Sequence, residues 1–230
     1  MECREIGGIE MKQIKSILLY VDGPLEPALL QRVVQIAKAV GASVTLAAVV
    51  EPARTQFSLT RPSFDLDEVE RLLVEDRQRQ LDEAAKSIDG PDVTIATRVL
   101  VGNAVDAIIR VVVAEDFDLL VKQPTPGHGL RQQLFGSIDM RLLRACPCPV
   151  TIGRPKTGEP TRRAITALDY AGENETKIRL NRSLLDFVSY ALETEFDEMH
   201  IVHAWSLYGE ALLTHGRGKL PPERLTEVLE

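Results

Sequence analysis

Buried-strand patterns alternate with amphipathic helix patterns over the first two thirds of the chain. Residues 17–21 (ILLYV) form an uninterrupted apolar run before Asp22, which is typical of a strand buried on both faces of a sheet. A helix pattern follows from Pro27 to Gly41, since proline suits a first helical turn and glycine suits a helix C-cap. The same reasoning predicts strands at 44–50, 93–99, 117–121 and 150–152, and helices at 65–87, 102–114 and 130–145.

This alternation favours one fold class. Strands separated by single helices, at this spacing, predict a doubly wound five-stranded parallel sheet with right-handed crossovers, complete by about Gly153. The expected strand order is 3-2-1-4-5. In such a sheet ligands bind at the carboxyl ends of the strands where the winding reverses, which here lies between strands one and four. Asp22 and the loop 122–130 are therefore the first candidates for a site.

A second copy of the pattern begins after a linker rich in proline, glycine and charge. Residues 164–169 (AITALD) repeat the first strand and place Asp169 where Asp22 stood. A helix pattern and a strand at 199–205 follow. The predicted organisation is an N-terminal extension (1–14), a complete domain (15–153), a linker (154–161) and a partial repeat of the same fold (162–230).

Composition and charge exclude several classes of partner. The net charge of −7 is spread over both halves, and the sequence shows no basic cluster of the kind that neutralises phosphates. We therefore expect no nucleic-acid partner. The longest apolar runs, such as 107–114 with Arg110 inside it, are far too short to cross a bilayer, so no membrane partner is expected. The first ten residues contain no apolar signal core, which favours the cytoplasm.

Three segments resemble the universal stress protein (UspA) family. They are 118–121 (DLLV), 134–137 (LFGS) and 143–150 (LRACPCPV), and the resemblance extends over 15–154 and resumes over 162–205. It implies the adenine nucleotide alpha hydrolase-like fold. Family members often dimerise through their fifth strands, so the resemblance also implies a homodimer through residues 150–152.

The resemblance further implies a nucleotide site, which this sequence only partly preserves. Nucleotide-binding members have a Gly-x2-Gly-x9-Gly-Ser/Thr motif after strand four, whose backbone N–H groups hold phosphates. Its last two positions match Gly136 and Ser137, but its first two glycines correspond to Gln123 and Pro126. Proline has a fixed φ and no N–H donor, so one phosphate ligand is removed. We therefore expect no cofactor. The alternative is ATP or AMP, bound by a rearranged loop in which Gly127 and Gly129 supply backbone amides. Lys122 and Arg131 would then supply positive charge.

Two further residues belong to this vestigial site by resemblance. Asp22 would lie beside the adenine, and backbone groups at Val49 would complete the base site. An equal alternative for Asp22 is a carboxylate that caps the turn after strand one. Lys122 and Cys146 also fit the tandem-domain type of the family, universal stress protein E, whose intact motif follows the fourth strand of the second domain; residues 162–230 contain no such motif.

Other chemistries are disfavoured by spacing. His200 and His203 are three apart on a predicted strand, which sends them to opposite faces and argues against a shared metal. Cys146 and Cys148 are interpreted as thiols beside a turn, and with Cys3 they are too few for a disulfide framework. A receiver domain would need an aspartate at the end of its third strand, which 97–101 lacks.

These observations predict a non-catalytic stress-response binding or regulatory protein with unidentified protein partners. Two alternatives remain open from the sequence. One is an ATP-binding protein with slow hydrolysis, and the other is a carrier of a small apolar ligand in a site no longer used for phosphates.

Overall fold

The computed structural model describes residues 14–52, 65–88, 92–124, 137–153, 163–169, 175–194 and 196–203. The chain divides into two compact units, Met1–Glu159 and Pro160–Glu230. Among the described residues, each unit has its own sheet, one of five strands and one of two strands.

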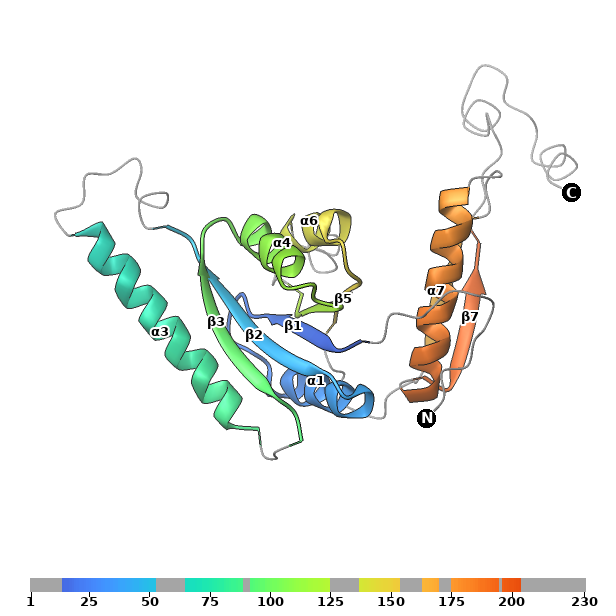
Figure 1. Ribbon diagram of the computed structural model, residues 1–230, viewed down its shortest axis with the longest axis horizontal. Coiled ribbons are helices and arrows are strands. Elements are labelled where there is room, and N and C mark those ends of the chain that lie inside the picture. The colour runs from blue at the N-terminus through green and yellow to red at the C-terminus, as the bar shows by residue number, and fades with distance from the viewer. Residues whose placement is uncertain are drawn as a thin grey trace, which may run out of the picture. The chain divides into compact units, whose positions relative to one another are not determined.

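Within the described residues, the first unit consists of five strands and the helices between them (Figure 1). In chain order the elements are β1 (Ser16–Tyr20), α1 (Pro27–Val40), β2 (Ser43–Val50), α3 (Leu66–Lys86), β3 (Ile95–Val101), α4 (Ala104–Ala114), β4 (Leu119–Lys122), α6 (Ser137–Ala145) and β5 (Val150–Ile152). The strand order is β3-β2-β1-β4-β5 and every pairing is parallel. The predicted fold class and strand order are confirmed.

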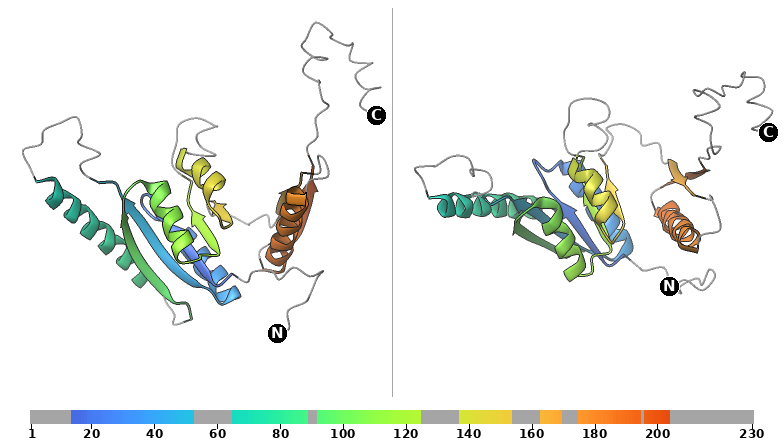
Figure 2. Two further views of the ribbon diagram at one scale, coloured as in Figure 1. Left: turned by 45° about the horizontal axis from the view of Figure 1, so that its top comes forward. Right: turned by 90° about the horizontal axis from the view of Figure 1, so that it is seen from above.

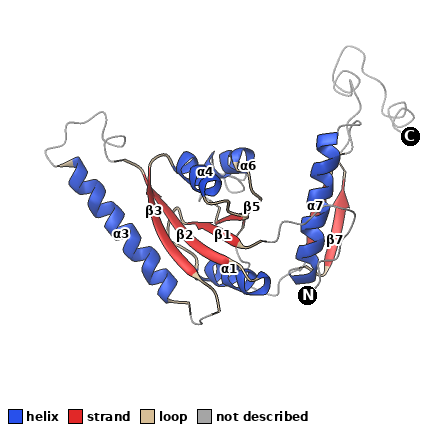
Figure 3. Ribbon diagram, viewed as in Figure 1, coloured by secondary structure: helices blue, strands red, loops and turns tan. Residues whose placement is uncertain are grey.

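Alternate residues of the central strand β1 face two separate apolar cores. Ile17 and Leu19 belong to a cluster with residues of α1 and α3, whereas Leu18 and Tyr20 belong to a cluster with residues of α4 and α6. Figures 2 and 3 show these two helix pairs on opposite faces of the sheet. Each fully buried aliphatic side chain contributes roughly 1.5–3 kcal/mol relative to its exposed state. Burial on both faces explains why the sequence of this strand is a continuous apolar run rather than an alternating one.

The ends of α1 are those that the sequence predicts. Pro27 occupies the first helical turn, where its missing N–H is not needed. Gly41 follows the last turn with φ 71°, and its N–H donates to the carbonyl of Ala37. A side chain at this left-handed position would be strained, so the glycine fixes the end of the helix.

The fourth strand begins later than the sequence suggests because α4 ends in a tight turn. Asp116 has φ 51°, and the N–H of Phe117 donates to the carbonyl of Val112 at 3.1 Å. This is the hydrogen-bond pattern of a Schellman motif, with aspartate in place of the usual glycine. Phe117 therefore closes the helix instead of opening the strand, and β4 starts at Leu119.

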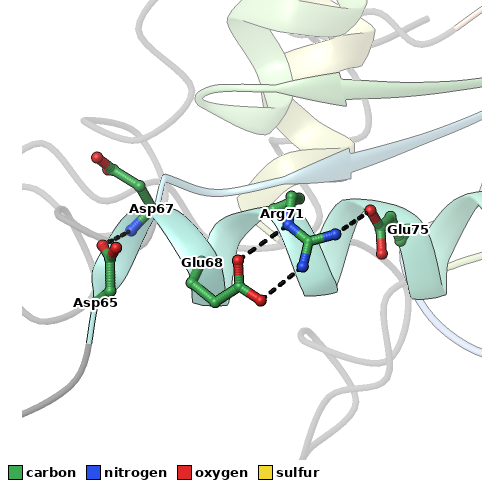
Figure 4. Close-up of polar contacts among 5 residues, drawn as sticks. All are labelled: Asp65, Asp67, Glu68, Arg71 and Glu75. Atoms are coloured by element: carbon green, nitrogen blue, oxygen red, sulfur yellow. Dashed lines mark hydrogen bonds and ion pairs between the residues drawn. The ribbon is translucent and has the colours of Figure 1, made fainter.

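The charged residues of α3 form the solvated face that their spacing predicts (Figure 4). The Asp65 carboxylate caps the helix by accepting a hydrogen bond from the Asp67 N–H at 3.0 Å. Arg71 donates to Glu68 and to Glu75, three residues before it and four after it, with all three side chains about half exposed. Contacts of this kind support the helix locally and form no site.

The second unit contains β6 (Arg163–Ala167), α7 (Glu175–Thr194) and β7 (Glu198–Val202). Its two strands pair in parallel. Asp169 follows β6 as Asp22 follows β1, and its carboxylate lies 2.7 Å from Lys177 Nζ. The assignment of this unit as an incomplete domain of the same family stays a prediction.

Candidate functional site

The candidate site lies where the winding of the first sheet reverses. β1 pairs with β2 on one side and with β4 on the other, and Tyr20 is level with both Ala47 and Lys122. The loop after β1 and the end of β4 therefore meet at the carboxyl edge of the sheet. This is the position at which doubly wound sheets bind ligands.

Lys122, the last residue of β4, has a completely buried side chain. Its ammonium Nζ lies 2.6 Å from Asp22 Oδ2 and 2.9 Å from Asp139 Oδ1. It also donates to the backbone carbonyl of Gln123 at 2.9 Å. An ammonium group has three N–H donors, and these three acceptors match them in number.

The three charged side chains of this ion cluster are buried. Asp139 is fully buried on α6, and the Asp22 side chain is only 9% exposed. Moving such charges out of water costs several kcal/mol each, so the cluster is tolerated only because each charge faces an opposite one. The Tyr20 ring contributes a cation–π contact, with its centroid 5.6 Å from Lys122 Nζ. Burial, and secondarily the charge of Asp22, raises the pKa of Tyr20 well above its ordinary value, which keeps the phenol neutral.

Gln123 forms a second connection across the same edge. Its side chain is nearly buried, with 6% exposure. The amide Nε2 donates to the carbonyl of Pro24 at 2.9 Å, and Oε1 accepts from the N–H of Glu26 at 3.3 Å. Glu26 is the N-cap residue of α1. A glycine at position 123 has no side chain with which to make this connection between β4 and the loop that leads into α1.

The structure describes part of the predicted nucleotide site. Val49 lies in β2 and is half-buried, two residues after Ala47, with which Tyr20 at the end of β1 is level. Ser137 is the first residue of α6. Pro126 and Gly136 lie outside the described residues, as do the alternative loop residues Gly127, Gly129 and Arg131. The nucleotide-binding roles of Asp22, Val49, Gly136 and Ser137 stay predictions.

One member of the buried cluster was missed by sequence reasoning. Asp139 has the same spacing as other polar residues of an amphipathic helix, so nothing in its helix pattern marks it as buried. A signal was available in β4, where a lysine ends the otherwise apolar run of Leu119 to Val121. A buried lysine requires a carboxylate partner, and that requirement directs a search to nearby helices.

The two histidines of the second unit that the structure describes have separate contacts. His200 lies 3.0 Å from Glu198 Oε1, whereas the His203 ring contacts the carbonyl of Leu168 at 2.9 Å. Among the described residues, no group of three or more histidine, cysteine and acidic side chains is placed to hold a metal ion. None of the described helices is long and apolar enough to span a bilayer.

Comparison with known proteins gives one family match. The model of the universal stress protein family matches residues 13–154. Among curated proteins, the chain is 26% identical over 152 residues to the universal stress protein E homolog of Haemophilus influenzae, covering 65% of this chain and 49% of that protein. It is 27% identical over 135 residues to universal stress protein E of Escherichia coli K12, covering 58% and 43%. The chain thus matches less than half of the length of each of these curated relatives.

Two solved structures from Pseudomonas aeruginosa have the same fold over most of the chain. A protein described as a putative universal stress protein aligns with a TM-score of 0.59 at 19% identity, covering 95% of this chain and 71% of its own. The functionally unknown protein PA1789 aligns with a TM-score of 0.59 at 18% identity, covering 95% and 69%. At this level of identity the similarity concerns the fold alone.

Proposed function

Because the chain belongs to the universal stress protein family, we propose that it is a non-catalytic stress-response protein whose first-unit nucleotide site has become a fixed structural cluster. It acts by binding and regulating partner proteins. The proposal combines the family fold with the condition of the site at the β1–β4 edge.

The observation that carries this proposal is the contact between Lys122 Nζ and Asp22 Oδ2 at 2.6 Å. In nucleotide-binding members that this chain resembles, the matching aspartate lies beside the adenine. Here that carboxylate is engaged by a buried cation from β4. The Lys122 donors already have three acceptors, so this cation is committed to the protein interior rather than to a phosphate.

The contacts of Gln123 give independent support. Its side chain bonds to the backbone at Pro24 and Glu26, on the loop between β1 and α1. A phosphate loop needs backbone N–H groups that can approach the ligand closely, and glycine permits this approach. With glutamine at the first glycine position and proline at the second, the close approach is hindered at both positions, and the proline removes one N–H donor.

A calorimetric titration of the purified chain with Mg-ATP, and separately with AMP, tests the proposal. We expect no saturable heat at micromolar protein and ligand concentrations. Saturable binding with a micromolar Kd would overturn the degenerate site and support the alternative of an ATP-binding protein with slow hydrolysis. An assay for released phosphate in the same samples separates binding from catalysis.

We also propose that the protein forms a homodimer through β5. Among the described strands, this one pairs with β4 and is the last in the sheet order, so no described strand covers its other edge. The cytoplasm is the proposed compartment, supported by two free thiols, Cys146 and Cys148, that a reducing environment preserves.

A further inference from the structure

Two cysteines lie in contact at the junction between α6 and β5. The sulfur atoms of Cys146 and Cys148 are 3.5 Å apart, with one residue between them. A disulfide has an S–S distance of about 2.05 Å, so the atoms need to approach by only about 1.5 Å to form the bond. This juxtaposition is independent of the nucleotide site.

The local backbone favours this approach. Cys146 N–H donates to the carbonyl of Leu142 at 2.9 Å, which anchors the first cysteine to the last turn of α6. Pro147 and Pro149 have fixed φ angles on either side of the second cysteine, so little backbone freedom is lost when the sulfurs join. The carbonyl of Pro149 accepts from the N–H of Leu120 on β4 at 3.0 Å, which anchors the other end of the turn.

The pair is also accessible and chemically asymmetric. Both thiols are free and partly exposed. The hydrogen bond from the Cys148 thiol lowers the pKa of Cys146 to about 7, against the opposing effect of burial. The same contact, with burial, raises the pKa of Cys148. A reactive thiolate beside a protonated thiol is the arrangement of an attacking cysteine and its resolving partner.

We propose that Cys146 and Cys148 form a reversible redox site that hydroperoxides oxidise to an intrachain disulfide. The Cys146 thiolate attacks the outer oxygen of the peroxide and breaks the O–O bond. The sulfur becomes a sulfenic acid, and the departing alkoxide or hydroxide takes a proton from water. The Cys148 sulfur then attacks the sulfenic sulfur, its proton leaves with the hydroxyl group, and water is released. Overall, the two thiols lose two hydrogens and become a disulfide. An organic hydroperoxide gives an alcohol and one water, and hydrogen peroxide gives two waters.

A mass-spectrometric experiment on the full chain tests the site. A Cys3→Ser background removes the remaining thiol of the chain. The reduced protein is treated with equimolar hydrogen peroxide, blocked with N-ethylmaleimide and digested with trypsin, which isolates both cysteines in the peptide Ala145–Lys156. We expect this peptide to lose two hydrogens and bind no maleimide, and dithiothreitol to restore two reactive thiols.

Two serine variants in the same background assign the roles. Cys148→Ser should accumulate a sulfenic acid at Cys146 that dimedone traps. Cys146→Ser should react with peroxide at least roughly tenfold more slowly than Cys148→Ser. The reason is that the thiolate fraction of the remaining thiol, Cys148, is small at neutral pH. Serine is nearly isosteric with cysteine, and circular dichroism of both variants verifies the fold.

Three results would overturn the proposal. The first is a peptide that retains two maleimide-reactive thiols after peroxide treatment. The second is equal oxidation rates in the two serine variants, and the third is direct conversion of both cysteines to sulfinic acids without a disulfide.

Discussion

Lys122 Nζ and Asp139 Oδ1 lie 2.9 Å apart, and both side chains are completely buried. With Asp22, this pair joins three segments that are distant in sequence: the loop after β1, the end of β4 and the first turns of α6. Replacing a buried ion pair by well-packed apolar groups is often neutral or stabilising, so stability alone does not explain its presence. Removing one partner has a different effect, since the other charge stays buried and loses this attraction.

The first prediction concerns this asymmetry. Lys122→Met should lower the free energy of unfolding by roughly 3–5 kcal/mol, because two buried carboxylates lose the ammonium group that lies 2.6 Å and 2.9 Å from them. Lys122→Met/Asp139→Asn should recover part of that loss by removing one of the two charges. Urea unfolding followed by circular dichroism measures both changes.

Lys38→Met is the matched control, because Lys38 is partly exposed and its ion-pair partner among the described residues is the exposed Asp92; its effect should stay within about 1 kcal/mol. If Lys122→Met behaves like this control, the cluster does not hold the fold together.

The second prediction concerns the residues at the first two glycine positions of the phosphate motif. Gln123→Gly/Pro126→Gly should strengthen ATP binding relative to the unaltered chain. The double change restores backbone freedom and one N–H donor, and it removes the Gln123 contacts with Pro24 and Glu26. Calorimetric titration measures the difference, with Gln123→Gly alone as the control that leaves the proline in place. If both variants bind ATP as weakly as the unaltered chain, the Lys122–Asp22 contact is sufficient to prevent nucleotide binding.

Features that depend on residues close together in the sequence could be predicted, whereas features that depend on contacts between distant elements could not. The fold was accessible because each buried strand carries its own apolar run, and because Pro27 and Gly41 mark helix ends through local backbone geometry. Asp139 could not be identified in the same way. Its burial depends on Lys122, a partner from another element, and the helix pattern around it is that of an ordinary amphipathic helix. The late start of β4 was missed because Asp116 adopts a conformation usually reserved for glycine.

The third prediction concerns the thiol of Cys146. The Cys148→Ala variant removes the S–H donor that stabilises the Cys146 thiolate, so the pKa of Cys146 should rise from about 7 toward or above the ordinary thiol value of about 8.5. The rate of iodoacetamide alkylation, measured against pH on the peptide Ala145–Lys156 in the Cys3→Ser background, should shift its midpoint to higher pH by the same amount. An unchanged midpoint would show that the hydrogen bond between the sulfurs does not control the reactivity.

The fourth prediction concerns self-association through β5. Leu120 N–H donates to the Pro149 carbonyl and Gly153 N–H donates to the Lys122 carbonyl, so alternate residues of this segment face β4. In a parallel pair the intervening residues, including Ile152, direct their N–H groups away from β4. Ile152→Pro should therefore abolish the dimer while leaving the β4–β5 pairing intact. Ile152→Ala keeps the N–H and is the control. Sedimentation equilibrium measures the outcome, and a dimer that persists in Ile152→Pro places the interface elsewhere.

The last prediction concerns residues 162–230, which we expect not to fold alone. Among the described side chains of the second unit, Leu168 is the only apolar one that is fully buried. Ile165 is 72% exposed and Ile201 is 54% exposed, although both lie in strands of its sheet.

The structure describes two strands and one helix in this segment, and a sheet of that size buries too little apolar area to offset the entropy of ordering its residues. This segment should be ordered only where it packs on residues 1–153 or on another chain. Expressed by itself, 162–230 should show a coil-like far-UV spectrum and amide exchange close to that of an unstructured peptide. Residues 15–153 expressed alone are the control and should unfold cooperatively, since both apolar cores of the first sheet lie within them. A cooperative thermal transition in the isolated segment 162–230 would show that its small sheet and helix supply enough burial without a partner surface.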